Sequence, residues 1–153
     1  GDIKMEKFIR LDYDKGFRGK EHVSSATGDG EHFEAGISCY KISKEKCVDA
    51  IINLCEYWFE FAKECQFKDF DINIFEGYYV GEGASYEDLA TCEKHLHCIG
   101  GSLFNEVYDL YYMHETYLEE NGDIEELEEN YKDEYITTEE FEAKIEGMFI
   151  KYL

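Results

Sequence analysis

The sequence contains no proline and only one tryptophan, Trp58. Without proline, glycine is the only strong break in the chain, so element boundaries are read mainly from glycine and from capping residues. Long apolar runs are also missing. No stretch approaches the roughly 18 apolar residues of a membrane span, and no signal peptide opens the chain. We therefore expect no membrane segment and a cytoplasmic location.

Basic residues are scarce. The chain has 15 Lys and Arg against 36 Asp and Glu, which gives a net charge of −21. Residues 1–48 carry nine acids and nine bases, whereas residues 49–153 carry 27 acids and six bases, so the whole excess lies in the second part. A charge of this size repels nucleic acid and anionic lipid, and it speeds association with basic partners. Direct binding to nucleic acid or to a membrane is therefore not expected.

The composition still predicts a folded domain, because 44% of the residues are hydrophobic and 16% are aromatic. At 153 residues the chain is long enough for one domain with a real core. Three of the six cysteines, Cys47, Cys55 and Cys65, fall on or beside one apolar helix face, where a cysteine behaves as a small hydrophobe. We expect reduced thiols rather than disulfides.

A helix over residues 43–65 is the predicted centre of the fold. Its apolar positions repeat with the 3.6-residue period of a helix, and Ser43 is placed to cap its first turn. Period-two alternation predicts strands over residues 6–13, 32–42, 68–74 and 92–99, with a hairpin segment at 78–80 and a loop over 14–30. The prediction is an α+β domain, with a small, mostly antiparallel sheet packed on this helix.

The rest of the chain is predicted to be helical. Ser102 is a candidate cap for a helix that reaches Gly122, and the pairs Asp123/Glu126 and Thr137/Glu140 have capping-box spacing. We therefore expect one domain over residues 1–153, in which 6–99 form the sheet with its helix and 102–153 form acidic helices.

An acidic run extends from Glu115 to Glu146. It holds fourteen acids against two bases, Lys132 and Lys144. On a helix, carboxylates three and four residues apart lie about 5–6 Å from one another and repel, so a sequence selected only for stability would place more bases among them. Rows of fixed negative charge also approximate a phosphate backbone. The residues predicted to bind a partner are Glu115, Glu119, Glu120, Glu125, Glu126, Glu128, Glu129, Asp133, Glu134, Glu139, Glu140 and Glu142.

Two other clusters contain residue types that can carry chemistry. Cys92, His95, His97 and Cys98 have the side chains of a zinc site, but strand alternation would put the cysteines and the histidines on opposite faces, which favours core cysteines and exposed histidines. The loop of residues 18–27 gathers Arg18, Lys20, His22, Ser24, Ser25 and Thr27, as an anion or nucleotide pocket might. A polar surface loop is the simpler interpretation. No metal or cofactor is predicted.

In its small size, its lack of proline, its acidity and its one-sided charge, the chain resembles the nucleic-acid-mimic inhibitors that phages use against host defence, the anti-CRISPR and anti-restriction proteins. This resemblance implies a stoichiometric inhibitor without catalysis, whose partner is a basic nucleic-acid-binding protein in the cytoplasm of a bacterial host. Two alternatives remain: a toxin-immunity protein that blocks a basic nuclease, and a small enzyme that acts on a nucleotide-like substrate through the loop between Arg18 and Thr27.

Overall fold

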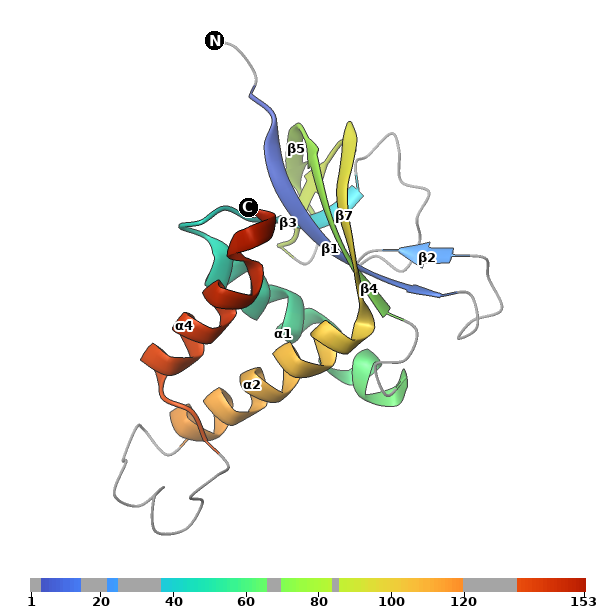
Figure 1. The fold of residues 1–153 in the computed structure, drawn as a ribbon. Coiled ribbons are helices and arrows are strands. Elements are labelled where there is room, and N and C mark those ends of the chain that lie inside the picture. The colour runs from blue at the N-terminus through green and yellow to red at the C-terminus, as the bar shows by residue number, and fades with distance from the viewer. Residues whose placement is uncertain (1–3, 15–21, 25–36, 66–69, 84–85, 120–134) are drawn as a thin grey trace.

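The structure is a computed structural model. It describes residues 4–14, 22–24, 37–65, 70–83, 86–119 and 135–153. Within these ranges the predicted α+β class is confirmed: an antiparallel sheet packs on three helices (Figure 1). The strands are β1 (Glu6–Asp14), β2 (His22–Ser24), β3 (Ile37–Lys41), β4 (Phe70–Gly77), β5 (Tyr79–Glu82), β6 (Asp88–Ala90) and β7 (Lys94–Gly100). The helices are α1 (Cys47–Cys65), α2 (Gly101–Glu119) and α4 (Thr138–Phe149), and a 3₁₀ turn, Ile150–Tyr152, follows α4.

The centre of the sheet is the long antiparallel pair β1 and β4. The strand order is β5-β6-β3-β1-β4-β7, and β2 pairs with the C-terminal end of β1. Alternation along β1 places Ile9 and Leu11 in the helix-facing core and Phe8 in a smaller cluster of its own, as the sequence pattern predicts. Phe75 of β4 stacks on Phe8 with ring centroids 5.6 Å apart. Both faces of the sheet are therefore buried along its centre.

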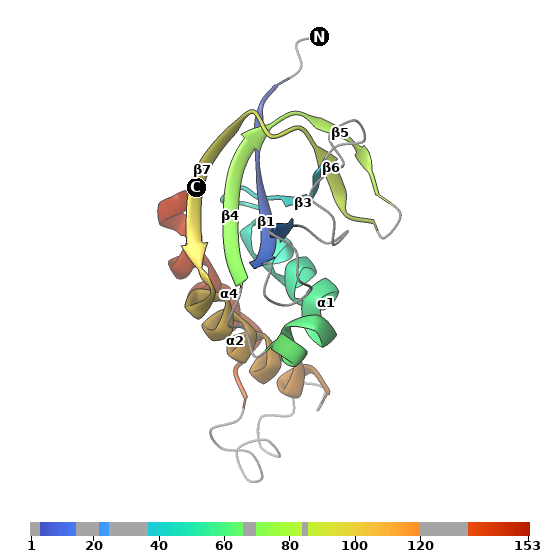
Figure 2. The same ribbon diagram turned by 90° about the vertical axis from the view of Figure 1, so that its right-hand side faces the viewer.

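A bend in the ribbon formed by β4–β5 and β6–β7 folds one edge of the sheet over. Figure 2 shows this curvature, which carries β5 and β6 away from β4 and β7. At the bend a side chain on Gly77 would lie 1.7 Å from the Thr91 carbonyl oxygen, so only glycine fits there. The Tyr78 N–H donates to the Thr91 hydroxyl (2.9 Å), and the Thr91 N–H donates to the Tyr78 carbonyl (2.9 Å). The bend lets β6 pair with β3 and cover the Phe8–Phe75 cluster.

Helix α1 supplies the largest apolar face against the sheet. Ala50, Ile51 and Leu54 are buried there beside two cysteines, Cys47 and Cys55. Burial raises the pKa of the Cys47 thiol to about 11, with a smaller contribution from the charge of Glu146. A neutral thiol packs as a small hydrophobe, as predicted. The side chains of Trp58 and Cys65, also predicted for this face, lie outside the described residues.

Helices α2 and α4 complete the core. Their buried positions follow the helical period: Phe104, Val107, Tyr108 and Tyr111 on α2, and Phe141, Ile145 and Phe149 on α4. In Figure 1 both helices lie on the same side of the sheet as α1. None of the helices that the structure describes is long and apolar enough to cross a membrane.

Several local predictions were wrong. The segment expected to be a loop, 14–30, contains β2, and the strand predicted at 78–80 is β5, which pairs with β6 rather than folding back on β4. Cys92 and Cys98 are exposed, not core residues: Cys92 precedes β7, and Cys98 lies next to the buried Ile99, so alternation along the strand puts it on the opposite face. Helix α2 begins at Gly101, so Ser102 lies inside its first turn instead of capping it.

Candidate interaction surface

The predicted acidic residues divide into a described group and an undescribed group. Glu115 and Glu119 lie on the last two turns of α2, and Glu139, Glu140 and Glu142 lie near the start of α4. All are exposed except Glu115, which is half-buried. Seven others lie outside the described residues: Glu120, Glu125, Glu126, Glu128, Glu129, Asp133 and Glu134.

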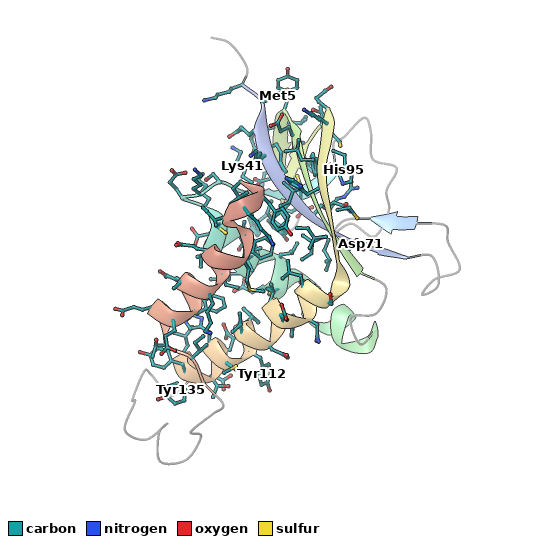
Figure 3. All side chains as sticks on the ribbon, viewed as in Figure 1. Met5, Lys41, Asp71, His95, Tyr112 and Tyr135 are labelled. Atoms are coloured by element: carbon teal, nitrogen blue, oxygen red, sulfur yellow. The ribbon has the colours of Figure 1, made fainter. Side chains whose placement is uncertain are left out.

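The structure brings the described acids together because the end of α2 packs on the start of α4. His114 of α2 stacks on Phe141 of α4 with ring centroids 4.5 Å apart, and its Nε2 lies 2.9 Å from the Thr138 hydroxyl. One turn further on, Tyr117 stacks on Tyr135 at 6.3 Å. Figure 3 shows Tyr135 at this end of the molecule. We call this region the α2–α4 junction, and its described acids are Glu115, Glu119, Glu139, Glu140 and Glu142.

His114 is the polar centre of the junction. It is 6% exposed, and burial lowers its pKa, while the nearby Glu142 carboxylate offsets part of that shift. A neutral imidazole can hydrogen bond to Thr138 and stack on Phe141 without bringing an unpaired charge into the core. The junction therefore has an uncharged interior under an acidic rim.

The acids at the start of α4 have a structural role. Thr137 is the N-cap: its hydroxyl oxygen accepts a hydrogen bond from the Glu140 N–H (3.3 Å), and its O–H donates to the Glu140 carboxylate (3.1 Å). This confirms the predicted pairing of Thr137 with Glu140. Glu139 and Glu140 lie in the first turn, where a negative charge interacts favourably with the helix dipole. Stability alone explains these two acids.

The acids at the end of α2 have no such explanation. The C-terminal end of a helix disfavours negative charge, typically by about 0.3–1 kcal/mol per group at low salt. Glu115 and Glu119 lie there, and the last turn of α2 contains no base. The N-terminus of α4 lies beside them and offsets part of this cost. No ion pair joins either glutamate to a base among the residues that the structure describes.

A third helix extends the acidic rim. Burial raises the pKa of the Tyr111 hydroxyl on α2, and the charges of Glu115 and then of Glu56 raise it further. Both carboxylates therefore lie near that hydroxyl, although Glu56 belongs to α1. On α4, Glu146 is exposed and continues the helical row formed by Glu139 and Glu142. Glu56 was not among the predicted site residues, because only the packing of α1 against α2 brings its charge near Tyr111.

A groove of about 430 Å³ runs between α2 and α4. Its lining combines two acids and one base with apolar groups: Glu106, Asp109, Leu110, Lys144, Gly147 and Met148. A Cβ added at Gly147 would meet no atom within 4 Å, so a small side chain would fit at this position. The sequence predictions did not include Glu106 and Asp109. Their spacing of three residues, in a helix that has no Lys or Arg, is the signal that could have found them.

The structure does not bring the residues of the other two predicted clusters together into a site. Cys92 and Cys98 are exposed, and His95 on β7 hydrogen bonds through Nε2 to the Asn73 side-chain oxygen at 2.9 Å. Across the described part of the chain, no group of three or more His, Cys, Asp and Glu side chains is placed to hold a metal. Of the loop between Arg18 and Thr27, only the backbone of His22–Ser24 is described, as β2; the rest lies outside the described residues.

Comparison of the chain with protein-family models, with curated proteins and with solved structures finds no match.

Proposed function

We propose that this protein is a stoichiometric inhibitor that binds a basic nucleic-acid-binding protein through the acidic rim of the α2–α4 junction. The carrying observation is the position of Glu115 and Glu119, at the end of α2 that disfavours negative charge. Glu115 is half-buried and Glu119 is exposed, and surface charges that cost stability are better explained by a binding role than by folding. The nucleic-acid-binding surface of the partner would bind this rim in place of a phosphate backbone.

The whole helical layer supports this role by its charge. Helix α2 carries four acids and no Lys or Arg, and α4 carries four acids and only Lys144. Such a surface attracts a basic groove over distances of about one Debye length, roughly 8 Å at physiological ionic strength. Complementary charge of this kind mainly accelerates association. An inhibitor of this type competes with nucleic acid for the groove and needs no catalytic group of its own.

The α2–α4 groove offers a place for one side chain of the partner. An arginine or lysine has an apolar stem and a charged head, which match Leu110 and Met148 on one hand and Glu106 and Asp109 on the other. Lys144 lines the same groove, but the two carboxylates outnumber its ammonium group. Tyr112 lies on the same helix but does not line the groove; it is 60% exposed and offers a separate aromatic face to a cation (Figure 3).

A displacement assay tests the proposed function. Fluorescently labelled duplex DNA would be bound to each of several bacterial nucleases: RNA-guided nucleases, restriction enzymes and nuclease toxins. The protein should release the DNA from at least one of them at about one equivalent, and less effectively as salt rises. Release confined to a nuclease toxin would identify an immunity protein, which is the same mode of binding with a different target. If the protein displaces DNA from none of the nucleases tested, the proposal is contradicted for these three classes of nuclease.

A further inference from the structure

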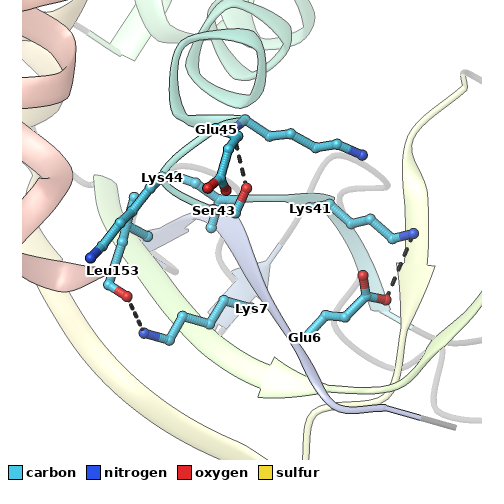
Figure 4. Close-up of a pocket in the computed structure, with 9 residues that line it drawn as sticks. Glu6, Lys7, Lys41, Ser43, Lys44, Glu45 and Leu153 are labelled. Atoms are coloured by element: carbon cyan, nitrogen blue, oxygen red, sulfur yellow. Dashed lines mark hydrogen bonds and ion pairs between the residues drawn. The ribbon is translucent and has the colours of Figure 1, made fainter.

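A second site lies at the opposite end of α4. A pocket of about 360 Å³ is formed where β1, β3, the turn before α1 and the end of the described chain meet (Figure 4). Its lining consists of Glu6, Lys7, Lys41, Ile42, Ser43, Lys44, Glu45, Lys46 and Leu153. Four of the chain's 15 Lys and Arg residues therefore line one pocket, in a protein whose net charge is −21.

Two of the four lysines are held in place by neighbours. Lys7 donates to the main-chain oxygen of Leu153 at 2.7 Å. Lys41 pairs with Glu6 at 3.7 Å, and its ammonium group lies 4.2 Å from the centre of the Tyr79 ring. In Figure 4, Lys7 extends toward Leu153 while Lys41 extends with Glu6 to the other side. These contacts hold two positively charged side chains at the sides of the pocket.

The other two lysines have no such partner. Lys44 and Lys46 are exposed in the turn before α1, and no ion pair joins them to an acid within the described part of the chain. The Ser43 hydroxyl oxygen accepts the Lys46 N–H at 3.1 Å, which fixes the turn that carries both residues. Helix α1 begins at Cys47, directly after these two lysines, and the partial positive charge of its N-terminus adds to theirs.

The balance of charge and size indicates the kind of ligand. The lining side chains carry four ammonium groups against the two carboxylates of Glu6 and Glu45. The volume lies within the range of about 300–1,000 Å³ found for small-molecule sites, and it exceeds what a single monovalent ion needs. Lysine ammonium groups bind phosphate and carboxylate oxygens as point charges. We propose that this pocket binds a compact multivalent oxyanion, with Lys44 and Lys46 as the ligand-binding cations.

Direct titration tests this proposal without any knowledge of the protein's partner. Pyrophosphate and citrate are the probes, and sodium chloride of matched ionic strength is the control for screening, because salt also relieves the self-repulsion of an acidic protein. We expect saturable shifts of the backbone amide signals of residues 41–47 in NMR spectra with either probe. The probe that binds more tightly identifies the oxyanion as a phosphate or a carboxylate.

Paired variants assign the effect to the pocket. The double variant Lys44→Ala/Lys46→Ala should bind the tighter probe at least tenfold more weakly, whereas Lys94→Ala/Lys151→Ala changes the net charge equally at residues that do not line the pocket and should bind as the wild type does. Both pairs are exposed, so the fold should be retained. Shifts that match the chloride control, or equal binding by the two double variants, would overturn the site. Neither outcome bears on the displacement of DNA through the α2–α4 junction.

Discussion

The two ends of the α2–α4 junction carry the same residue type in opposite electrostatic settings. Glu139 and Glu140 begin α4, where the helix dipole favours them and Thr137 is hydrogen bonded to Glu140. Glu115 and Glu119 end α2, where the dipole disfavours them. The comparison shows that acids cannot be assigned a role by counting them along a sequence. Those at the start of α4 stabilise the fold, and those at the end of α2 are the better candidates for binding.

The largest expected effect tests whether the junction is a rigid platform at all. Phe141 is fully buried against His114, so Phe141→Ala should lower the free energy of unfolding by about 3–5 kcal/mol. Tyr112→Ala, which removes an exposed ring from α2, should change it by less than about 0.5 kcal/mol. Urea denaturation measures both. Similar losses in the two variants would mean that α4 does not pack on α2 as described.

The next prediction concerns the uncharged interior of the junction. Because the pKa of His114 is lowered in the folded state, the unfolded chain binds its proton more readily. The stability that neutral His114 contributes is therefore complete above its unfolded pKa of about 6.5 and is lost as the pH falls below that value.

The measurement is the unfolding free energy between pH 7.5 and pH 5.5. Acidification also relieves the self-repulsion of this protein, which acts in the opposite direction, so the relevant quantity is the difference between variants. His114→Gln should lose less stability on acidification than the wild type. If His114→Gln loses as much stability on acidification as the wild type does, His114 does not titrate as a buried group.

A smaller effect sharpens the structural half of the comparison. Thr137→Ala removes the N-cap of α4 and should cost about 1 kcal/mol, within a range of roughly 0.5–2. Thr137→Ser keeps a hydroxyl and serves as the control, since it should recover most of that loss. Thermal unfolding at pH 7 distinguishes them. An alanine variant as stable as the wild type would show that Glu140 is not engaged in capping.

The smallest predicted effect tests whether acids at the end of α2 and at the start of α4 have opposite effects on stability. Glu139→Gln should destabilise the protein and Glu119→Gln should stabilise it, each by about 0.3–1 kcal/mol at low salt, because the two charges lie at opposite poles of their helices. Both differences should shrink as salt screens the charges. Differential scanning calorimetry at two salt concentrations provides the measurement. Loss of stability in both variants would remove the reason to assign Glu119 to binding.

Much of the fold could be predicted because periodicity reports burial directly. Ile9, Leu11, Ile72 and Ile74 alternate in the sequence and all reach the helix-facing core. The Thr137/Glu140 spacing identified the start of α4 in the same way. Strands β2 and β6, with three residues each, are too short for a periodic signal. The bend at Gly77 depends on the approach of Thr91, a contact between residues fourteen positions apart.

The candidate site could be predicted only in part, for a related reason. Charge counting located Glu115, Glu119 and Glu142, but it could not separate them from the capping residue Glu140, since that distinction depends on helix polarity and a side-chain hydrogen bond. The effect of the Glu56 charge on the pKa of Tyr111 depends on how α1 packs against α2. The lysine pocket was also missed, because Lys7 and Lys41 are far from each other in the sequence and neighbouring strands bring them together.

The most direct test of the binding role is the association rate constant with the nuclease that the displacement assay identifies. It would be measured by stopped-flow fluorescence for two triple variants with equal changes in net charge. Glu115→Lys/Glu119→Lys/Glu142→Lys reverses acids of the junction, whereas Asp71→Lys/Glu82→Lys/Glu93→Lys reverses exposed acids of the sheet and its connections. We expect the junction variant to associate at least tenfold more slowly than the sheet variant, with a much smaller difference in dissociation. Equal association rates for the two variants would contradict a specific acidic surface and leave only the effect of net charge.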